Sequence, residues 1–395
     1  MTGAERGDAA PRTAADAVDV GMAPSELETM IGETVQRLFS DHVSPELLDA
    51  AEAGAWPGAL WSLVDDSGLP KALCAAEAGG SGARWLDAYP VFAGIGRWSV
   101  PLPLAATMVA GWLLGLAGVD VPQGPVAIAP AAASLSLAGV AGAGVDRSLL
   151  DGTLDAVPWA GRCRWLLASV AGASGPCVLV DLSAPSVERC ESHNMAGEPR
   201  AQLRFGGTPV CVAFANPLPL LEDPLLQLGA LSHGAMLVGA LERALDLSVA
   251  YANERVQFGK ALARYQVLQH GLAAVAGELV AARVATRVAF ASLHAGAGGR
   301  TSAFDIAVAK VRCGQAASRM AALAHQIHGA IGFTREHALQ RSTRRLWSWR
   351  QEFGSDAAWA AVLGRAAIAR GGADFWPALC ERRLGAADGG PSPGP

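Results

Sequence analysis

Arg255, Gln257 and Phe258 stand close together in a short polar stretch between two long helical patterns. A guanidinium group can bind a phosphate through two parallel hydrogen bonds, and an aromatic ring can cover an apolar ring system. Gly259 allows the backbone to turn tightly or to approach a ligand. These residue types predict a turn that holds a nucleotide cofactor. The alternative is a plain helical hairpin with a solvated arginine, and the spacing alone favours that alternative.

Two sequence motifs extend this prediction. Residues 251–260 read YANERVQFGK and are followed by Tyr265 and Gln266, while residues 326–334 read QIHGAIGFT. In this order and at this separation, the two motifs resemble the C-terminal signatures of acyl-CoA dehydrogenases. The resemblance covers roughly residues 24–385 and is strongest in the last third of the chain.

The resemblance implies FAD-dependent removal of two hydrogens across the Cα–Cβ bond of an acyl-CoA thioester. In that reaction a carboxylate takes the α-proton, a hydride leaves Cβ for the flavin, and the thioester carbonyl is polarised. The resemblance also implies FAD contacts for eight residues. Arg255 would contact the pyrophosphate, with Gln257 and Phe258 beside it, and Gln266 would lie near the adenosine end. Gln326, His328 and Gly329 would contact an FAD that reaches over from a neighbouring subunit, and Trp159 would lie beside the isoalloxazine.

Other interpretations of three of these residues stay open. Without the resemblance, a hydrogen-bonded helix end is the preferred interpretation of Gln326 and His328, and a core position suits Trp159 equally well. In the expected assembly, Arg255 of one protomer and the pair Gln326 and His328 of its neighbour close around the same dinucleotide.

The base that the family reaction requires has one candidate here, Glu352. Many members of the family carry a glutamate before Gly-Thr, and an ungapped count from Gln326 puts Phe353 at that position. Glu352 lies one residue earlier, so it can act only if the local backbone shifts; otherwise the position is empty. Some members use a glutamate early in a preceding helix instead, and the corresponding residue here is Gly229.

A basic and aromatic cluster follows the second motif: Arg344, Arg345, Trp347, Trp349 and Arg350. It could steer the phosphates of CoA or the flavin, or pack between subunits. A solvated basic helix face with two buried tryptophans is an equally good interpretation.

Helices are expected to position most of these residues. Asp223 as N-cap and Pro224 at the first helical position begin a C-terminal bundle. Its helices are predicted over residues 225–252, 266–295, 302–331 and 356–370. Near the N-terminus, Ser25 and Glu28 form a capping box before further apolar residues at helical spacing.

Short apolar runs bounded by Gly and Pro occupy the middle of the chain and predict a small antiparallel β-domain. The expected strands are residues 126–129, 134–137, 165–170, 177–181 and 210–214. In the family this domain covers the flavin ring, and a Leu-Thr-Glu-Pro-x-x-Gly-Ser-Asp segment there contacts flavin and substrate. Residues 124–130 take its place here without any polar side chain, so independent flavin binding by this chain is an open question.

The predicted fold is mainly α with a middle β-domain, as in acyl-CoA dehydrogenases. Five segments are expected: a disordered tail (1–22), an N-terminal helical domain (23–120), a small antiparallel β-barrel domain (121–218), a C-terminal four-helix bundle (219–385) and a second disordered tail (386–395). No GxGxxG motif follows a strand and no P-loop occurs, which argues against a Rossmann nucleotide site.

The composition excludes several classes of protein. A net charge of −5 gives no basic footprint for nucleic acid. Residues 101–119 are the nearest approach to a membrane span, but Pro and Gly interrupt them, so no membrane insertion is expected. The seven cysteines are scattered and form no C-x-x-C motif. They indicate buried thiols in a reducing cytoplasm, with neither a disulfide framework nor a metal site.

Together these features predict an FAD-dependent acyl-CoA dehydrogenase of fatty acid or steroid side-chain degradation. Residues 255–259 with 344–354 resemble the branch of the family that acts on steroid or bulky side-chain acyl-CoAs, whose members often pair two unlike subunits. A homo- or heterotetramer is therefore expected, with electron-transfer flavoprotein or a similar acceptor as a further partner. Two alternatives stay open: a non-catalytic subunit that completes the FAD site of a heteromer, and a flavin oxidase or monooxygenase on the same fold.

Overall fold

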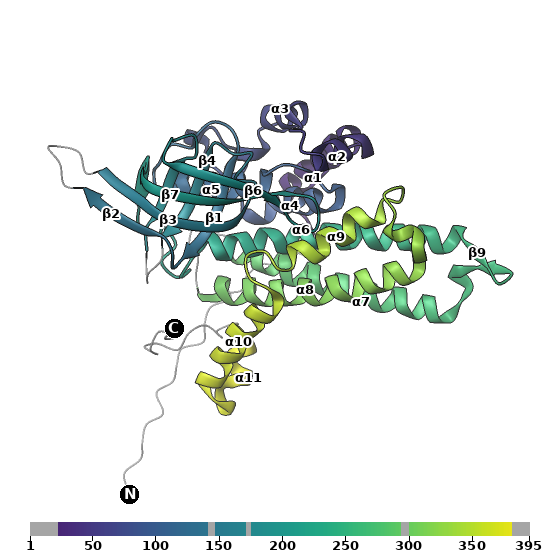
Figure 1. Cartoon of the computed structure of the whole chain (residues 1–395). Coiled ribbons are helices and arrows are strands. Elements are labelled where there is room, and N and C mark those ends of the chain that lie inside the picture. Colours follow the sequence, from purple (N-terminus) through teal and green to yellow (C-terminus); the bar gives the residue numbers. More distant parts are fainter. Residues whose placement is uncertain (1–22, 141–146, 171–174, 294–299, 381–395) are drawn as a thin grey trace, which may run out of the picture.

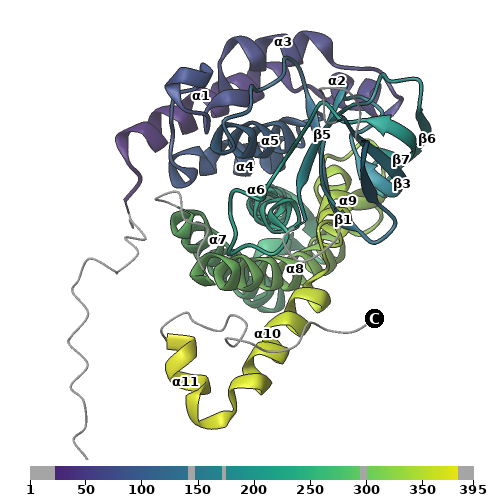
Figure 2. The same ribbon diagram turned by 90° about the vertical axis from the view of Figure 1, so that its left-hand side faces the viewer.

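The C-terminal part of the protein is a bundle of long helices (Figure 1). The computed structural model describes residues 23–140, 147–170, 175–293 and 300–380, so both predicted tails lie outside the described residues. The C-terminal helices are α6 (Pro224–Glu254), α7 (Gln266–Ser292), α8 (Arg300–His328), α9 (Leu339–Trp349), α10 (Asp356–Arg370) and α11 (Gly372–Cys380). Helices α6, α7 and α8 pack against one another, while α10 and α11 extend away from them (Figure 2).

The bounds of α6, α7, α8 and α10 agree with the four predicted helices to within a few residues, with one difference; the predicted end of the second helix, residue 295, lies outside the described residues, and α9 and α11 were not predicted. Helix α8 ends at His328, and a 3-10 turn, η5 (Gly329–Phe333), continues the chain where a single helix to residue 331 was predicted. Gly329 has a φ of 62°, a left-handed conformation that ends an α-helix and that glycine adopts without strain.

Helix α6 is the central element because it packs against α7, α8 and α9 and against the β-domain. Asp223 caps it as predicted, since its carboxylate accepts hydrogen bonds from the backbone N–H groups of Leu225 (3.1 Å) and Leu226 (3.2 Å). The helix is long and apolar enough to cross a membrane, but 94% of its 18-residue apolar window is buried inside the protein. It is therefore a core helix.

The N-terminal helices cover one side of α6. They are α1 (Glu26–His42), α2 (Pro45–Glu52), α3 (Gly58–Asp66), α4 (Trp85–Trp98) and α5 (Leu104–Leu116), with 3-10 turns η2 (Leu69–Lys71) and η3 (Ala76–Ala78). Ser25 caps α1 by accepting a hydrogen bond from the N–H of Glu28 (3.0 Å). The predicted capping box is only half present, because the Glu28 carboxylate pairs with Arg287 of α7 instead.

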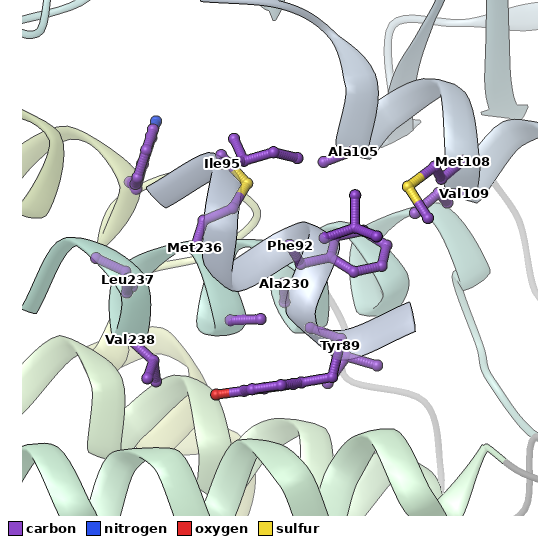
Figure 3. Packing of buried hydrophobic residues seen from close by; sticks show 14 of the residues in the cluster. Tyr89, Phe92, Ile95, Ala105, Met108, Val109, Ala230, Met236, Leu237 and Val238 are labelled. Carbon is purple, nitrogen blue, oxygen red and sulfur yellow. The ribbon is translucent and has the colours of Figure 1, made fainter. Parts of the chain in front are cut away.

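Helices α4 and α6 approach each other closely enough to require glycine. A Cβ atom on Gly96 would lie 1.8 Å from the carbonyl oxygen of Met236, and one on Gly239 would lie 1.8 Å from that of Ala93. The main hydrophobic core surrounds this contact (Figure 3). Its side chains from α4, α5 and α6 include Tyr89, Phe92, Ile95, Ala105, Met108, Ala230 and Met236.

The β-domain contains two four-stranded sheets. One has the strand order β1 (Val126–Ala132), β4 (Trp165–Val170), β5 (Cys177–Asp181), β8 (Val212–Phe214). The other has the order β2 (Ser136–Val140), β3 (Arg147–Pro158), β7 (Pro199–Pro209), β6 (Val187–His193). The β1–β4 pair is parallel, so the prediction of a purely antiparallel domain was wrong for this pair.

Three strands were missed in the sequence: β3, β6 and β7. Strand β6 is solvent-exposed along nearly its whole length and has no apolar alternation, and β7 carries Pro and Gly residues that are typical of turns. The cysteine prediction was also wrong in part. Cys74, Cys163, Cys177 and Cys313 are buried free thiols, but Cys190, Cys211 and Cys380 are exposed.

Candidate functional site

A pocket between the β-domain and the helices brings two predicted site residues together. Trp159, directly after β3, and Glu352, in the loop after α9, both line it. Its walls are otherwise mainly apolar and come from four parts of the chain: Leu102, Ala105, Ile128, Met236 and Phe353. A planar ring and a carboxylate therefore face one apolar space, as the resemblance implies for the reacting end of the site.

Glu352 is already bound by other side chains. Its Oε1 accepts hydrogen bonds from Arg200 of β7 and from Asn194 Nδ2 (3.0 Å), and its Oε2 lies 3.1 Å from His233 Nε2. His233 Nδ1 lies 2.9 Å from the carbonyl oxygen of Gly229, which can only accept. Both groups that face the imidazole nitrogens are therefore hydrogen-bond acceptors when Glu352 is ionised.

These neighbours set the acidity of the carboxyl group. Burial alone would raise the pKa of Glu352, but the charge of Arg200 and the hydrogen bond from His233 outweigh it and lower the pKa to about 2. A general base works best when its pKa is near the operating pH. Glu352 is ionised but is a weak proton acceptor in this arrangement.

A second carboxylate of the network, Glu198, also lines the pocket. Glu198 accepts hydrogen bonds from Trp349 Nε1 and Asn194 Nδ2, both at 2.9 Å, and pairs with Arg345 Nε at 3.2 Å. Glu198 and Arg345 are 4% and 1% exposed. Two carboxylates and two guanidinium groups thus alternate inside the protein and join the β-domain to α9, and a buried charge is tolerated only when it is paired in this way.

Lys310 of α8 holds the other side of the Glu352 loop. Its Nζ donates to the carbonyl oxygens of Trp349 (2.8 Å) and Arg350 (3.2 Å), at the end of α9. Burial lowers the pKa of Lys310 to about 8. The buried ammonium group therefore fixes the backbone from which Glu352 projects.

The two positions where the family carries its base meet in space. A Cβ atom on Gly229 would lie 2.2 Å from the ring of Phe353, so the ring occupies the space that a side chain at residue 229 would need. The Phe353 ring also packs on His233, with centroids 4.9 Å apart. Neither position carries a carboxylate, and an apolar ring fills the place where they converge.

Three aromatic residues at the pocket and at the hairpin have strained backbones. Trp159, Phe258 and Phe353 have φ values of 63°, 50° and 52°. A left-handed conformation costs about 1–3 kcal/mol for a non-glycine residue and persists only where the surroundings enforce it. The strain occurs both at the pocket and at the turn that contains Arg255.

The turn at Arg255 lies at the opposite end of α6. Strands β9 (Val256–Gln257) and β10 (Lys260–Ala261) form a hairpin whose central residues, Phe258 and Gly259, both have positive φ. Phe258 is 91% exposed. Tyr265 braces the hairpin, because its hydroxyl donates to the carbonyl oxygen of Gln257 (3.0 Å). Figure 1 shows the hairpin projecting from the end of the bundle farthest from the β-domain.

The charged and polar groups of this hairpin are exposed. Arg255 forms no ion pair with any residue in the described part of the chain, and its side chain is exposed. Gln257 and Gln266 are also exposed. A short 3-10 turn, η4 (Leu262–Arg264), separates the hairpin from α7.

The second motif lies beside this hairpin in the same chain. Gln326 and Gly329 are exposed, but His328 is 3% exposed and its ring stacks on Tyr251 with centroids 4.5 Å apart. The two motifs were expected to meet across two protomers; in the structure, Tyr251 and His328 already join them within one protomer.

The predicted cofactor residues therefore form two groups, which we name the pocket end (Trp159 and Glu352) and the hairpin end (Arg255, Gln257, Phe258, Gln266, Gln326, His328 and Gly329). The 22 residues from His233 to Arg255 rise about 33 Å along α6, at 1.5 Å per residue. The two groups are therefore far apart within one chain.

The basic and aromatic cluster of α9 is mostly internal. Arg345 pairs with Glu198, Arg344 with Glu52 (2.6 Å) and Arg350 with Asp356 (2.9 Å). Trp349 is 1% exposed, whereas Trp347 is 40% exposed. The cluster is neither a solvated basic face nor a set of free cations for CoA phosphates within one chain. Among the described residues, no group of three His, Cys, Asp or Glu side chains could hold a metal ion.

Two family models match the sequence on either side of the β-domain. Residues 25–121 match the acyl-CoA dehydrogenase N-terminal domain and residues 223–368 match the acyl-CoA dehydrogenase C-terminal domain, which together is more than half of the chain. This chain belongs to the acyl-CoA dehydrogenase family. The unmatched residues between the two include 124–130, where the family's polar flavin-contacting segment has no counterpart.

Several acyl-CoA dehydrogenases are similar to this family member over most of its length. IpdE2, an acyl-CoA dehydrogenase of Mycobacterium tuberculosis, is 28% identical over 82% of this chain and 92% of IpdE2. The ChsE4-ChsE5 complex of Mycobacterium tuberculosis matches in structure with a TM-score of 0.75 at 20% identity, covering 88% of this chain and 98% of the other. The Tcur3481-Tcur3483 steroid ACAD matches with a TM-score of 0.74 at 22% identity, covering 87% and 99%.

Several residues that bind Glu352 or the backbone beside it have no signal in the sequence. Arg200, His233, Asn194 and Lys310 come from four different elements, and no spacing relates them to Glu352. Only the presence of charged or polar residues within apolar patterns, such as His233 in α6, could have marked them as buried and paired.

Proposed function

We propose that this chain is a subunit of an FAD-dependent acyl-CoA dehydrogenase in which each flavin lies between two chains. The observation that carries the proposal is the separation of the two groups of candidate residues, about 33 Å along α6. Each group is half of a site. A complete site then consists of the pocket end of one subunit and the hairpin end of another.

The residues at the hairpin end fit the dinucleotide part of FAD. Arg255 presents an exposed guanidinium group without an ion-pair partner among the described residues, which suits a pyrophosphate. The amides of Gln257, Gln266 and Gln326 supply polar groups for the nucleotide edges. Phe258, which is 91% exposed, would be covered by the ligand or by the other subunit.

The residues at the pocket end suit the reacting groups. Trp159 is half-buried and offers one face to an apolar space, where it would lie beside the isoalloxazine. The apolar walls exclude water from a bound acyl group. FAD, when bound, would accept the hydride that leaves Cβ of the substrate.

The pocket of this chain favours a non-catalytic role within the assembly. Glu352 is held by Arg200 and His233 with its pKa lowered to about 2, and Phe353 fills the space over Gly229. We infer that the base belongs to the pocket of an unlike partner subunit, and that this chain completes the FAD site of that partner through its hairpin end. The competing role, with Glu352 as the base of an active subunit, requires the carboxylate to leave Arg200 and His233.

We propose a steroid or other bulky side-chain acyl-CoA as the substrate of the assembly, with electron-transfer flavoprotein or a similar acceptor, in the cytoplasm. The support is the likeness to the Tcur3481-Tcur3483 steroid ACAD and to the two-component ChsE4-ChsE5 complex. Among the described residues, the buried free thiols fit a reducing compartment.

Flavin absorbance and bleaching test this function. The chain is purified alone and together with a homologous chain that carries a glutamate at the position of Phe353, and acyl-CoA is added without oxygen. We expect flavin to be retained only in the mixed assembly and to bleach with a bulky side-chain acyl-CoA. Glu352→Gln should leave bleaching intact, as should the control Glu188→Gln on exposed β6.

Two results would contradict the proposal. An absence of flavin from both preparations would contradict the proposal that the assembly is FAD-dependent. Loss of bleaching in Glu352→Gln, with unchanged flavin content and melting temperature, would make Glu352 the base and this chain an active subunit.

A further inference from the structure

We propose that the ring stack of Tyr251, His328 and His337 positions the two cofactor motifs relative to each other, and that protonation of its histidines loosens the hairpin. This inference rests on the proposed function only for the identity of the ligand that the hairpin binds. His328 is then a positioning residue, which acts through Tyr251 rather than by touching the cofactor.

The stack joins three separate segments of the chain. The rings of Tyr251 and His328 are 4.5 Å apart and nearly parallel, with an angle of 23° between their planes. His337, in the loop before α9, packs edge-on against both, at 4.7 Å from His328 and 6.1 Å from Tyr251. The end of α6, the end of α8 and the loop before α9 are therefore held by one set of rings.

The position of Tyr251 sets the position of Arg255. The carbonyl oxygen of Tyr251 accepts a hydrogen bond from the N–H of Arg255 (2.9 Å), and the carbonyl oxygen of Arg255 accepts one from the N–H of Leu262 (2.9 Å). A shift of the Tyr251 ring would move both ends of the hairpin. On the other side, Gly329 directly follows His328 with a positive φ, so the second motif starts from the same stack.

A second pair of rings fixes the far end of the 326–334 motif. His325 stacks on Phe333 with centroids 3.9 Å apart, and its Nε2 lies 2.9 Å from Thr343 Oγ1 of α9. His328 is 3% exposed and its Nδ1 donates to the carbonyl oxygen of Ala324 (2.8 Å). The ring therefore exposes almost none of its surface to a ligand.

The charged and titratable groups around the stack disfavour protonation. They are His325 and His337 beside His328, Tyr251 on α6, and Arg243, whose charge acts on His337. Within the described ranges, no carboxylate forms an ion pair with any of the three histidines. A proton on one ring would therefore place an uncompensated cation next to the others.

The pKa directions agree with this geometry. Burial lowers the pKa of His325, His328 and His337, and the charge of His328 adds to the effect on the other two. A histidine whose pKa is lowered in the closed arrangement binds fewer protons there than in an open one. The closed arrangement is fully stable above the ordinary histidine pKa of about 6.5, and it weakens as the pH falls below that value.

Amide hydrogen exchange of the full chain tests the stack without any cofactor. Protection factors of residues 255–262 and 329–334 are compared between pH 7.5 and pH 5.5 in the natural chain and in His337→Asn. The amide side chain of this variant can still accept the hydrogen bond from the N–H of Leu339, as His337 Nδ1 does (3.1 Å), but it cannot titrate. Protection of both segments should fall together at pH 5.5 in the natural chain, and should fall less in His337→Asn, which leaves one titratable ring fewer at the stack.

Matched variants separate this role from general folding. His42→Asn, at an exposed histidine of α1, should leave the pH dependence unchanged. Tyr251→Phe keeps the stacked ring and should behave like the natural chain, whereas Tyr251→Ala should lower protection of both segments already at pH 7.5. Equal pH dependence in the natural chain and in His337→Asn, or loss of protection in only one of the two segments, would overturn the inference.

Flavin retention by the mixed assembly gives a second readout. Flavin content after gel filtration should fall below the ordinary histidine pKa of about 6.5 in the natural assembly and fall less with His337→Asn. If no assembly binds flavin but exchange behaves as expected, the proposed function fails and the positioning role stands. If flavin binds but exchange of the two segments is independent of pH, the positioning role fails and the proposed function stands.

Discussion

Charged groups are paired inside the protein at the pocket end of α6 and exposed at the hairpin end. At the pocket end, Glu198, Arg200 and Arg345 are buried, Glu352 is 14% exposed, and these four side chains pair with one another. At the hairpin end, Arg255 and the amides are exposed, while the His328 ring stacked on Tyr251 is buried. The first arrangement is complete within one chain, and the second offers its polar groups to something outside it.

The pocket end is therefore expected to contribute to the stability of the fold, and the hairpin end to the binding of a ligand or partner. Removing one partner from a buried network leaves another charge unpaired, which destabilises the fold. Changing an exposed group alters binding with little effect on folding. Mutations at the two ends of one helix should therefore have different consequences, with the largest losses of stability at the pocket end and the smallest at the hairpin end.

Arg200→Met should cost about 3–5 kcal/mol in the free energy of unfolding, because it leaves Glu352 and Glu198 buried without their shared cation. Urea unfolding at pH 7 measures the change. The control is Arg164→Met, which breaks an exposed pair with Asp181 (2.8 Å) and should change the stability far less, because solvent screens an exposed ion pair. Similar losses in both variants would contradict the buried network.

Acidification should destabilise the pocket end through Glu352. Its pKa is lowered to about 2 in the folded protein from an ordinary value of 4.5, so its contribution is present above pH 4.5 and is lost as the pH falls toward 2. The loss is on the order of 3 kcal/mol at about 1.4 kcal/mol per pKa unit. Unfolding curves recorded between pH 6 and pH 3 should be less pH-dependent in Glu352→Gln. An identical slope in both proteins would show that Glu352 is not held as described.

Gly229→Ala should destabilise the fold by about 1–3 kcal/mol, because the new methyl group overlaps the ring of Phe353. The double variant with Phe353→Ala should recover part of that loss, as measured by thermal unfolding in a double-mutant cycle. Gly277→Ala on α7 is the control, since nothing lies within 4 Å of its Cβ position. Additive effects of the two substitutions would mean that residues 229 and 353 do not meet.

Arg255→Gln should change the free energy of unfolding by no more than about 0.5 kcal/mol, because the side chain is exposed and makes no ion pair within the described residues. In the mixed assembly it should weaken flavin binding by about tenfold or more, the value of a charge-assisted hydrogen bond. Fluorescence titration with FAD measures the affinity. Arg264→Gln, at another exposed arginine of the same end, is the control; equal losses in both variants would argue against a specific phosphate contact.

Most of the fold could be predicted from the sequence because its helices carry local signals. The N-cap of Asp223 and the helical spacing of α6, α7 and α10 depend on neighbouring residues, and these predictions were confirmed. Strand β7 was missed because it pairs with β3, which lies far from it along the chain, and β6 was missed because it is exposed and has no apolar alternation, although only residues 194–198 separate it from β7. The parallel β1–β4 pair depends on the same kind of distant contact.

The candidate site could be predicted only in part, for the same reason. Trp159 and Glu352 were predicted separately and meet in one pocket. The bonds from Arg200 and His233 to Glu352 join residues 152 and 119 positions apart, and no local pattern encodes them. That Phe353 fits over Gly229 follows from packing alone.

A structure of the flavin-loaded assembly tests the central claim most directly. We predict that Arg255 of this chain lies within hydrogen-bond distance of the pyrophosphate of an FAD whose isoalloxazine occupies the pocket of another subunit. An FAD whose pyrophosphate and isoalloxazine both contact this one chain, with Arg255 facing solvent, would contradict the account.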